Sequence, residues 1–414
     1  MEGVYKNSTE VASLGGDMIN LVDASLEKKF NRVPIYMTDV VDACLRGRLN
    51  LFLQGDTGSG KTQLARDAMG YFPGKNLFVL GRNDMDTREL FQQVNPEFLR
   101  ALRGGRIGKG VTLKTLTDKI NNNLTVVDEL PNCVPAVRAQ LFNLFDGYIE
   151  IDGVPYQIGD GYSVGIATGN IGQKFTESSN ELGRALKDRM HVIVDVDYFH
   201  PRPSDTTEIL SGNTNPRVDF SGNSEDRAKD IIALHKDLAD RPIPLEKIVI
   251  ANYLIHGLDY CSKGSKRAMK EAWPTQLENH EQGSDVGLVL PVSVRAAKSI
   301  IRLSQALDDI AKEKGITTNP LESMMTAYKL VSTYSGVLND ADVRNKYDGN
   351  HYSALDAVVS TTTQQFKENA ERIAAGIEMV GHGKKEKKIL DGFKGRWSFM
   401  KNTLEGLLGK SKEQ

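Results

Sequence analysis

The most informative segment of the sequence reads Gly55-Asp56-Thr57-Gly58-Ser59-Gly60-Lys61-Thr62. It fits G-x-x-x-x-G-K-[ST] at every fixed position, a pattern that forms a phosphate-binding loop between a strand and a helix. Both neighbours are present, because the apolar run Leu51–Leu53 precedes the segment and the helix-forming stretch Gln63–Met69 follows it. In such a loop, backbone N–H groups and the helix N-terminus face the phosphates. The sequence therefore predicts a nucleoside triphosphate site formed by residues 55–62.

The last two residues of this loop carry the positive charge and the metal contact. We expect Lys61 to place its ammonium group at the β- and γ-phosphates, and Thr62 to place its hydroxyl on Mg²⁺. The guanine-reading pattern N-K-x-D occurs at Asn345–Asp348, but it follows a polar segment and not a buried strand. We attribute that match to chance. The predicted nucleotide is therefore ATP, with GTP as the alternative, and the predicted metal is Mg²⁺.

A pair of acids ends another apolar run, Leu124–Val127. Asp128 is predicted to hold the magnesium shell together with Thr62, and Glu129 to polarise the attacking water. Acids at the carboxyl end of a strand suit the ligand crevice of an open α/β sheet. The alternative is a helix N-cap followed by a first-turn Glu. Because a phosphate-binding loop lies upstream, we favour the catalytic interpretation.

Four further polar residues are candidates for three roles in hydrolysis. Asn170 follows the apolar run Val164–Ala167 and is predicted to bond the γ-phosphate and the lytic water. Arg189 or Arg184 is predicted to stabilise transition-state charge in the site of a neighbouring subunit. Arg295, next to the expected helix N-cap Ser293, is a candidate phosphate contact.

Short apolar runs separated by helix-length segments predict strands that are buried on both faces of a parallel sheet. Residues 149–158 break this alternation with a period-two pattern around Asp152-Gly153, which predicts an inserted β-hairpin. After Tyr198 the pattern is helical, with apolar residues recurring every three or four positions. The expected helices are 226–238, 245–260, 294–312, 321–337 and 354–379.

Composition excludes several classes of protein. The 52 basic and 54 acidic residues nearly cancel, giving a net charge of −2, and 40% of the 414 residues are hydrophobic. These values are those of an ordinary globular protein. The sequence contains no apolar run long enough to span a membrane, and the first residues lack the apolar core of a signal peptide. Three well-separated cysteines form no disulfide or zinc pattern. A reducing, cytoplasmic location is therefore expected.

The order of these parts resembles the AAA+ ATPases of the MoxR type, in the helix-2-insert clade that includes dynein-related ATPases. The resemblance covers about residues 31–310 and implies an α/β fold with a P-loop parallel sheet, an inserted β-hairpin, an all-helical lid and a helical C-terminal extension. The predicted parts are an N-terminal segment (1–30), the α/β nucleotide-binding domain (31–200), the lid (201–310), the extension (311–380) and a basic tail (381–414).

The resemblance also implies residue roles. Lys61 and Thr62 would belong to Walker A, and Asp128 and Glu129 to Walker B. Asn170 would be sensor 1, Arg189 the trans-acting arginine finger, and Arg295 sensor 2. Residues 96–113 lie where the family carries its helix-2 insert. The sequence departs from the family at 130–133, where Leu-Pro-Asn-Cys replaces Ile-Asn-Arg-Ala, and at Ile171, where proline is usual.

Two functions compete. The first, implied by the resemblance, is a ring-forming ATPase, hexameric in this family, that remodels a client protein, often with a von Willebrand factor A-domain partner. The alternative is a nucleic-acid-stimulated motor, because the insert carries Arg100, Arg103, Arg106 and Lys109, and basic loops track phosphate backbones. The basic tail is interpreted as a small docking element, with a membrane-surface helix as its alternative.

Overall fold

The computed structural model describes residues 36–84, 90–104, 114–151, 153–170, 187, 189–198, 207, 210–211, 217–218, 225–258 and 288–410. The N-terminal segment 1–30, Arg184, Arg106 and Lys109 lie outside these ranges. The chain divides into two compact units, a first that contains Tyr36–Met190 and Val194–Lys236 and a second that contains Asp237–Gln414. Among the helices that the structure describes, none combines the length and the apolar character that a bilayer crossing requires.

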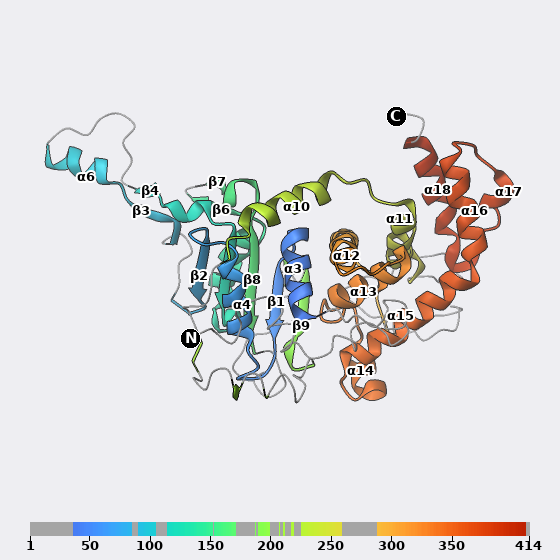
Figure 1. The fold of residues 1–414 in the computed structure, drawn as a ribbon, viewed down its shortest axis with the longest axis horizontal. Coiled ribbons are helices and arrows are strands. Elements are labelled where there is room, and N and C mark those ends of the chain that lie inside the picture. The colour runs from blue at the N-terminus through green and yellow to red at the C-terminus, as the bar shows by residue number, and fades with distance from the viewer. Residues whose placement is uncertain are drawn as a thin grey trace. The chain divides into compact units, whose positions relative to one another are not determined.

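A five-stranded sheet forms the centre of the first unit (Figure 1). Its strands are β1 (Leu51–Gln54), β2 (Asn76–Leu80), β5 (Leu124–Asp128), β8 (Val164–Gly169) and β9 (Val192–Asp195), in the order β2-β5-β8-β1-β9. The pairs β2–β5, β5–β8 and β1–β8 are parallel. Every residue of β1, β5 and β8 is buried, as the continuous apolar runs predict. The predicted parallel α/β fold is confirmed.

Helices and two small hairpins surround this sheet. The helices are α3 (Met37–Gly47), α4 (Lys61–Gly70), α7 (Pro135–Phe145) and α10 (Ala228–Asp240). The predicted hairpin is present as β6 (Tyr148–Ile151) and β7 (Val154–Gln157), which turn at Gly153 with φ 80°. A second antiparallel pair, β3 (Gln92–Val94) and β4 (Lys114–Leu116), carries the exposed helix α6 (Pro96–Arg103) on an arm that extends from the sheet (Figure 1).

Short 3₁₀ turns connect several of these elements. They are η2 (Asp118–Asn121), η3 (Leu130–Asn132), η4 (Gly159–Gly161) and η5 (Val196–Tyr198). Two of them follow the carboxyl ends of strands, since η3 comes after β5 and η5 comes after β9. These two turns carry side chains that reach the candidate site.

The second unit is helical in all of its described elements except an isolated bridge between Val289 and Leu338. Its longer helices are α11 (Leu245–Asn252), α12 (Val294–Glu313), α13 (Pro320–Ser332), α14 (Asp340–Tyr347), α15 (His351–Glu368), α16 (Ala370–Gly381) and α18 (Phe399–Lys410). Its shorter ones are η6 (Tyr253–Gly257), α17 (Lys387–Leu390) and η7 (Gly395–Trp397). The expected cap Ser293 accepts a bond from the backbone of Ala296 at 3.1 Å and begins α12.

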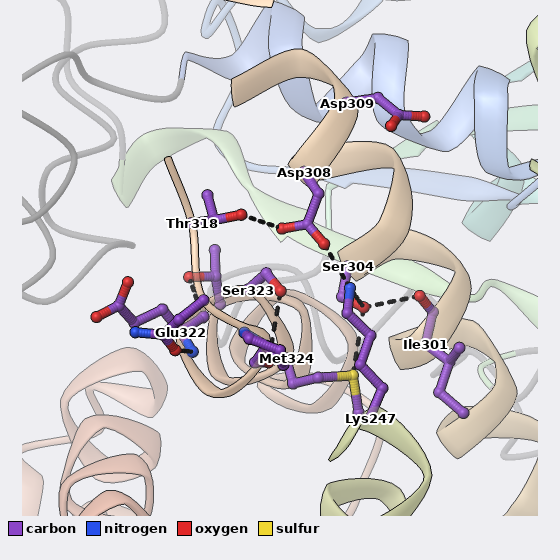
Figure 2. Close-up of polar contacts among 12 residues, drawn as sticks. Lys247, Ile301, Ser304, Asp308, Asp309, Thr318, Glu322, Ser323 and Met324 are labelled. Carbon is purple, nitrogen blue, oxygen red and sulfur yellow. Dashed lines mark hydrogen bonds and ion pairs between the residues drawn. The ribbon is translucent and has the colours of Figure 1, made fainter. Parts of the chain in front are cut away.

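A buried lysine joins three segments of this unit (Figure 2). Lys247 of α11 is 2% exposed, and its Nζ donates to Ser304 Oγ at 2.9 Å and to Asp308 Oδ2 at 2.6 Å on α12. The second oxygen of Asp308 accepts from Thr318 Oγ1, before α13, at 2.5 Å. Burial lowers the pKa of Lys247, and Asp308 opposes that shift. A buried charge needs such partners, and here they link α11 to α12 and α12 to the segment before α13.

The basic tail packs its apolar side chains inside the same unit. Trp397, Leu404 and Leu408 are buried. The Trp397 ring lies 4.9 Å from that of Tyr253 in η6, and Arg396 donates to the Tyr253 hydroxyl at 2.9 Å. The buried side chains of this segment are therefore used for intramolecular packing.

Candidate functional site

The predicted phosphate loop connects β1 to α4. Gly58 has φ 87° and Gly60 has φ 83°, in the left-handed region that glycine adopts without strain. Gly60 is also the N-cap of α4, so the first N–H groups of that helix border the loop. Such groups lack partners within the helix and form an anion-binding end. The backbone of this segment thus has the shape that a phosphate cradle requires.

Lys61 is held inside the loop by three oxygen atoms. Its Nζ donates to the backbone oxygens of Gly55 at 2.9 Å and Asp56 at 2.6 Å, and to Ser59 Oγ at 3.1 Å. Burial lowers the pKa of Lys61. Nearby carboxylates raise it, and Asp197 has the largest effect among them. The ammonium group is therefore held by polar atoms of the loop itself, which a phosphate can replace as its partners.

Asp128, the last residue of β5, accepts two hydroxyl hydrogen bonds on one oxygen. Thr62 Oγ1 of α4 donates to Asp128 Oδ1 at 2.9 Å, and Thr168 Oγ1 of β8 donates to the same atom at 2.5 Å. The Asp128 side chain is buried, with the residue only 8% exposed. A carboxylate beside a hydroxyl offers the oxygen ligands that Mg²⁺ prefers. Thr62 and Asp128, the two residues predicted to hold the metal, are thus in direct hydrogen-bond contact.

Glu129 is exposed and adopts a left-handed backbone conformation with φ 55°. Such a conformation is costly for a residue with a side chain, and it persists where the surroundings enforce it. The Glu129 N–H donates to Thr168 Oγ1 at 3.1 Å, and its Oε2 accepts from Asn132 Nδ2 at 2.6 Å. The candidate base is therefore fixed through both its backbone and its side chain.

Asn170 directly follows β8, the strand that lies between β5 and β1 in the sheet. Its Oδ1 is buried and, within the described part of the chain, has no hydrogen-bond partner. A buried polar atom of this kind calls for an explanation, since burying it without a partner is costly. The neighbouring Gly169 lies against Pro131 of the η3 turn. Lys61, Thr62, Asp128, Glu129 and Asn170 thus gather where β1, β5 and β8 end.

The two predicted arginines that the structure describes, Arg189 and Arg295, lie elsewhere. Arg189 Nε pairs with Asp146 Oδ2 at 2.8 Å, and its guanidinium lies 4.9 Å from the centre of the Phe142 ring. Its backbone oxygen accepts from Asn50 at 3.0 Å, just before β1, so Arg189 is at the strand ends opposite the phosphate loop. Arg295 is exposed in the first turn of α12, in the second unit. Its sensor role stays a prediction, as does the finger role of Arg189.

Sequence motifs do not reveal three residues of this site. Thr168 and Asn132 fix the two acids, as described above. Asp197 of η5 accepts a hydrogen bond from the Asp56 N–H and so braces the phosphate loop from β9. The sequence contains only a weak indication that Asp197 belongs to the site, because an acid shortly after an apolar run is its one recognisable feature.

A glycine-rich loop between a strand and a helix, with an acid pair at the end of a parallel strand of the same sheet, is the arrangement typical of P-loop nucleoside triphosphatases. Residues 50–190 match the family described as AAA domain, dynein-related subfamily. The chain therefore contains an AAA-type ATPase domain. That match covers β1, β2, β5 and β8 but not β9, and it includes every candidate residue named above except Asp197 and Arg295.

A solved structure with a similar fold comes from Cytophaga hutchinsonii and is described as a "putative ATPase". The likeness has a TM-score of 0.54 at 15% sequence identity, and it covers 86% of this chain and 98% of the other. At that identity it shows the fold alone, and it extends the shared architecture well beyond the AAA domain. No curated protein matches the sequence significantly.

Proposed function

We propose that this protein is a magnesium-dependent ATPase of the MoxR type, which assembles into a hexameric ring in the cytoplasm and uses hydrolysis to remodel a client protein. A von Willebrand factor A-domain protein is the expected partner, from the resemblance described above. The observation that carries the ATPase proposal is the convergence of Lys61, Thr62, Asp128, Glu129 and Asn170 at one edge of the sheet.

The residues present fit a magnesium–nucleotide complex. Lys61 and the N–H groups that begin α4 suit the phosphates, and the oxygens of Thr62 and Asp128 suit the metal. The buried Oδ1 of Asn170, without a partner among the described residues, is further support. When bound, Mg²⁺ would neutralise charge on the phosphate oxygens.

Glu129 is the group assigned to the attacking water. The Asn132 amide holds its carboxylate at 2.6 Å in the structure. That bond uses one lone pair of Oε2, so the carboxylate keeps acceptor sites, including those of Oε1, for the proton of a positioned water. Asn170, at the adjacent strand end, is assigned to orient the γ-phosphate.

Arg189 is assigned to the site of a neighbouring subunit. It lies at the strand ends opposite its own phosphate loop, and the Asp146 ion pair and the Phe142 ring hold its guanidinium. An arginine supplied in trans raises phosphoryl-transfer rates by about 10³ to 10⁵. This arrangement would make hydrolysis dependent on ring assembly.

The Glu129→Gln variant tests the ATPase proposal. It keeps the size of the side chain and an oxygen that can accept from Asn132, but removes the base. We expect ATP binding to be retained and turnover to fall by at least about 10²-fold. Glu150→Gln, an exposed change on β6, is the matched control and should leave both unchanged. Wild-type turnover in Glu129→Gln would refute the role of Glu129, and an inactive wild-type protein would refute the ATPase proposal.

One observation favours the second candidate, a nucleic-acid-stimulated motor. The arm presents Arg100, Arg103 and Lys114 as exposed side chains. Phosphate contacts by such residues weaken steeply with salt. ATPase stimulation by single- or double-stranded DNA at low salt, lost in an Arg100→Ala/Arg103→Ala variant, would favour the motor. The absence of stimulation at low salt would eliminate it.

A further inference from the structure

We propose that Thr168 is a positioning residue that fixes both acids of the hydrolytic site with one hydroxyl group. The proposal rests on the proposed function and adds a residue to that site. Thr168 lies on β8, is 1% exposed, and does not belong to the phosphate loop or the acid pair. Its Oγ1 donates to Asp128 Oδ1 at 2.5 Å and accepts from the Glu129 N–H at 3.1 Å.

A hydroxyl has a single proton and two lone pairs, so these two bonds have definite directions. The proton of Thr168 goes to the Asp128 carboxylate, and a lone pair receives the Glu129 N–H. The acid assigned to the metal is thereby held through its side chain, and the acid assigned to water is held through its backbone. Removing the hydroxyl changes both acids together.

The backbone of Glu129 needs such support because its φ of 55° is unfavourable for a glutamate. Its N–H would lose its acceptor if Thr168 lacked the oxygen, and that hydrogen bond would no longer help to hold the left-handed backbone. The residue could then relax toward an ordinary conformation. That change would move the Glu129 carboxylate away from the position that the η3 turn now enforces.

Asp128 depends on the same hydroxyl in a different way. Its Oδ1 is held from two sides, by Thr168 of β8 and by Thr62 of α4 at 2.9 Å. Thr62 is also assigned to the metal, so its hydroxyl would have to contact Mg²⁺ as well as Asp128 once the metal binds. Thr168 is the donor that remains dedicated to Asp128. Partners of this kind typically change metal affinity or activity by about 10–100-fold.

The test compares Thr168→Val, which keeps the shape without the hydroxyl, with Thr168→Ser, which keeps the hydroxyl without the methyl. The matched control is Thr125→Val on β5, because Thr125 is also buried and its Oγ1 bonds to no other described residue. Three quantities are measured: the Mg²⁺ concentration that half-saturates binding of a fluorescent ATP analogue, kcat, and the melting temperature.

We expect Thr168→Val to raise the Mg²⁺ midpoint and lower kcat by about 10-fold or more, Thr168→Ser to restore both to within about 3-fold, and Thr125→Val to match the wild type. An unchanged Mg²⁺ midpoint and kcat in Thr168→Val would overturn the proposal. Equal losses in the Val and Ser variants would also overturn it, because they would implicate packing of the methyl group.

Two measurements keep the test decisive. If Thr168→Val does not fold, the Mg²⁺ midpoints of Thr168→Ser and Thr168→Ala isolate the hydroxyl, and equal midpoints overturn the proposal. If the wild-type protein binds the analogue without hydrolysing it, the ATPase proposal fails. The Mg²⁺ midpoint still tests the hold of Thr168 on Asp128, so the two failures are distinguishable.

Discussion

Gly169→Ala should impair both the stability and the chemistry of the α/β unit. An ideal Cβ at Gly169 would lie 2.4 Å from Cδ and 2.5 Å from Cγ of Pro131, and 3.0 Å from Cζ of Phe52. Ordinary contacts begin at 3.4 Å, so the Pro131 ring or the end of β8 must move by about 1 Å. Both neighbours are buried, and a proline ring has no alternative rotamer that would relieve the clash.

The magnitude follows from where Pro131 lies. It is the central residue of η3, the turn that begins after Glu129 and ends at Asn132, and Gly169 itself precedes Asn170. Overpacking a buried site costs about 1–3 kcal/mol. A 1 Å misplacement of catalytic groups can cost about 10²-fold in rate. We therefore expect a lower unfolding free energy and a kcat reduced by about 10–100-fold, with ATP binding largely retained.

Urea unfolding and steady-state ATP hydrolysis measure the two effects. The matched control is Gly104→Ala at the end of α6, where the added Cβ would lie 3.5 Å from the nearest atom, the Arg100 backbone oxygen. That variant should match the wild type in both assays. A Gly169→Ala protein with the wild-type urea midpoint and kcat would refute the argument that the η3 turn and the end of β8 are packed too tightly to move independently.

Two further predictions concern charge. Burial lowers the pKa of Lys61 from the ordinary 10.5, and a bound triphosphate favours the charged form of the lysine. ATP affinity should therefore decline as the pH rises through that lowered pKa. The decline should begin at a lower pH than an ordinary lysine would give. Binding titrations between about pH 7 and 10.5 test this, and Lys61→Arg, which stays protonated, should remove the dependence. Arg189→Ala should lower turnover by about 10³-fold without weakening ATP binding, and Asp146→Asn should lower it less, because the ion pair only orients the finger. Weaker ATP binding by Arg189→Ala would contradict a role in trans.

The strands of the sheet were predictable because parallel strands buried on both faces appear as unbroken apolar runs. The apolar runs Leu51–Leu53, Leu124–Val127 and Val164–Ala167 became β1, β5 and β8. Their order in the sheet was not predictable, because a continuous run carries no information about its neighbour. The helix expected over 354–379 is divided at Asn369, whose side chain donates to the Gln365 backbone at 2.9 Å. Periodicity continues across that break and does not reveal it.

The candidate site was predictable where motif spacing defines it. The strand–loop–helix order predicted the positions of Lys61 and Thr62, and the apolar run before Asp128 predicted the acid pair. Thr168, Asn132 and Asp197 could not be predicted in the same way. Their contacts arise only after β5, β8 and β9 have assembled, and threonine or asparagine near a strand end is common in any protein.

The packing of η7 against η6 has a consequence for the synthesis of the chain. The hydrogen bond from Arg396 to Tyr253 joins residues 143 positions apart, and the Trp397 ring covers the same tyrosine. At about 5–20 residues per second, a ribosome needs about 7–30 s to proceed from one partner to the other. During that interval the apolar ring of Tyr253 has no Trp397 to cover it. The helical unit therefore cannot complete this packing before residue 397 has been made, and until then the uncovered Tyr253 ring is open to aggregation and chaperone binding.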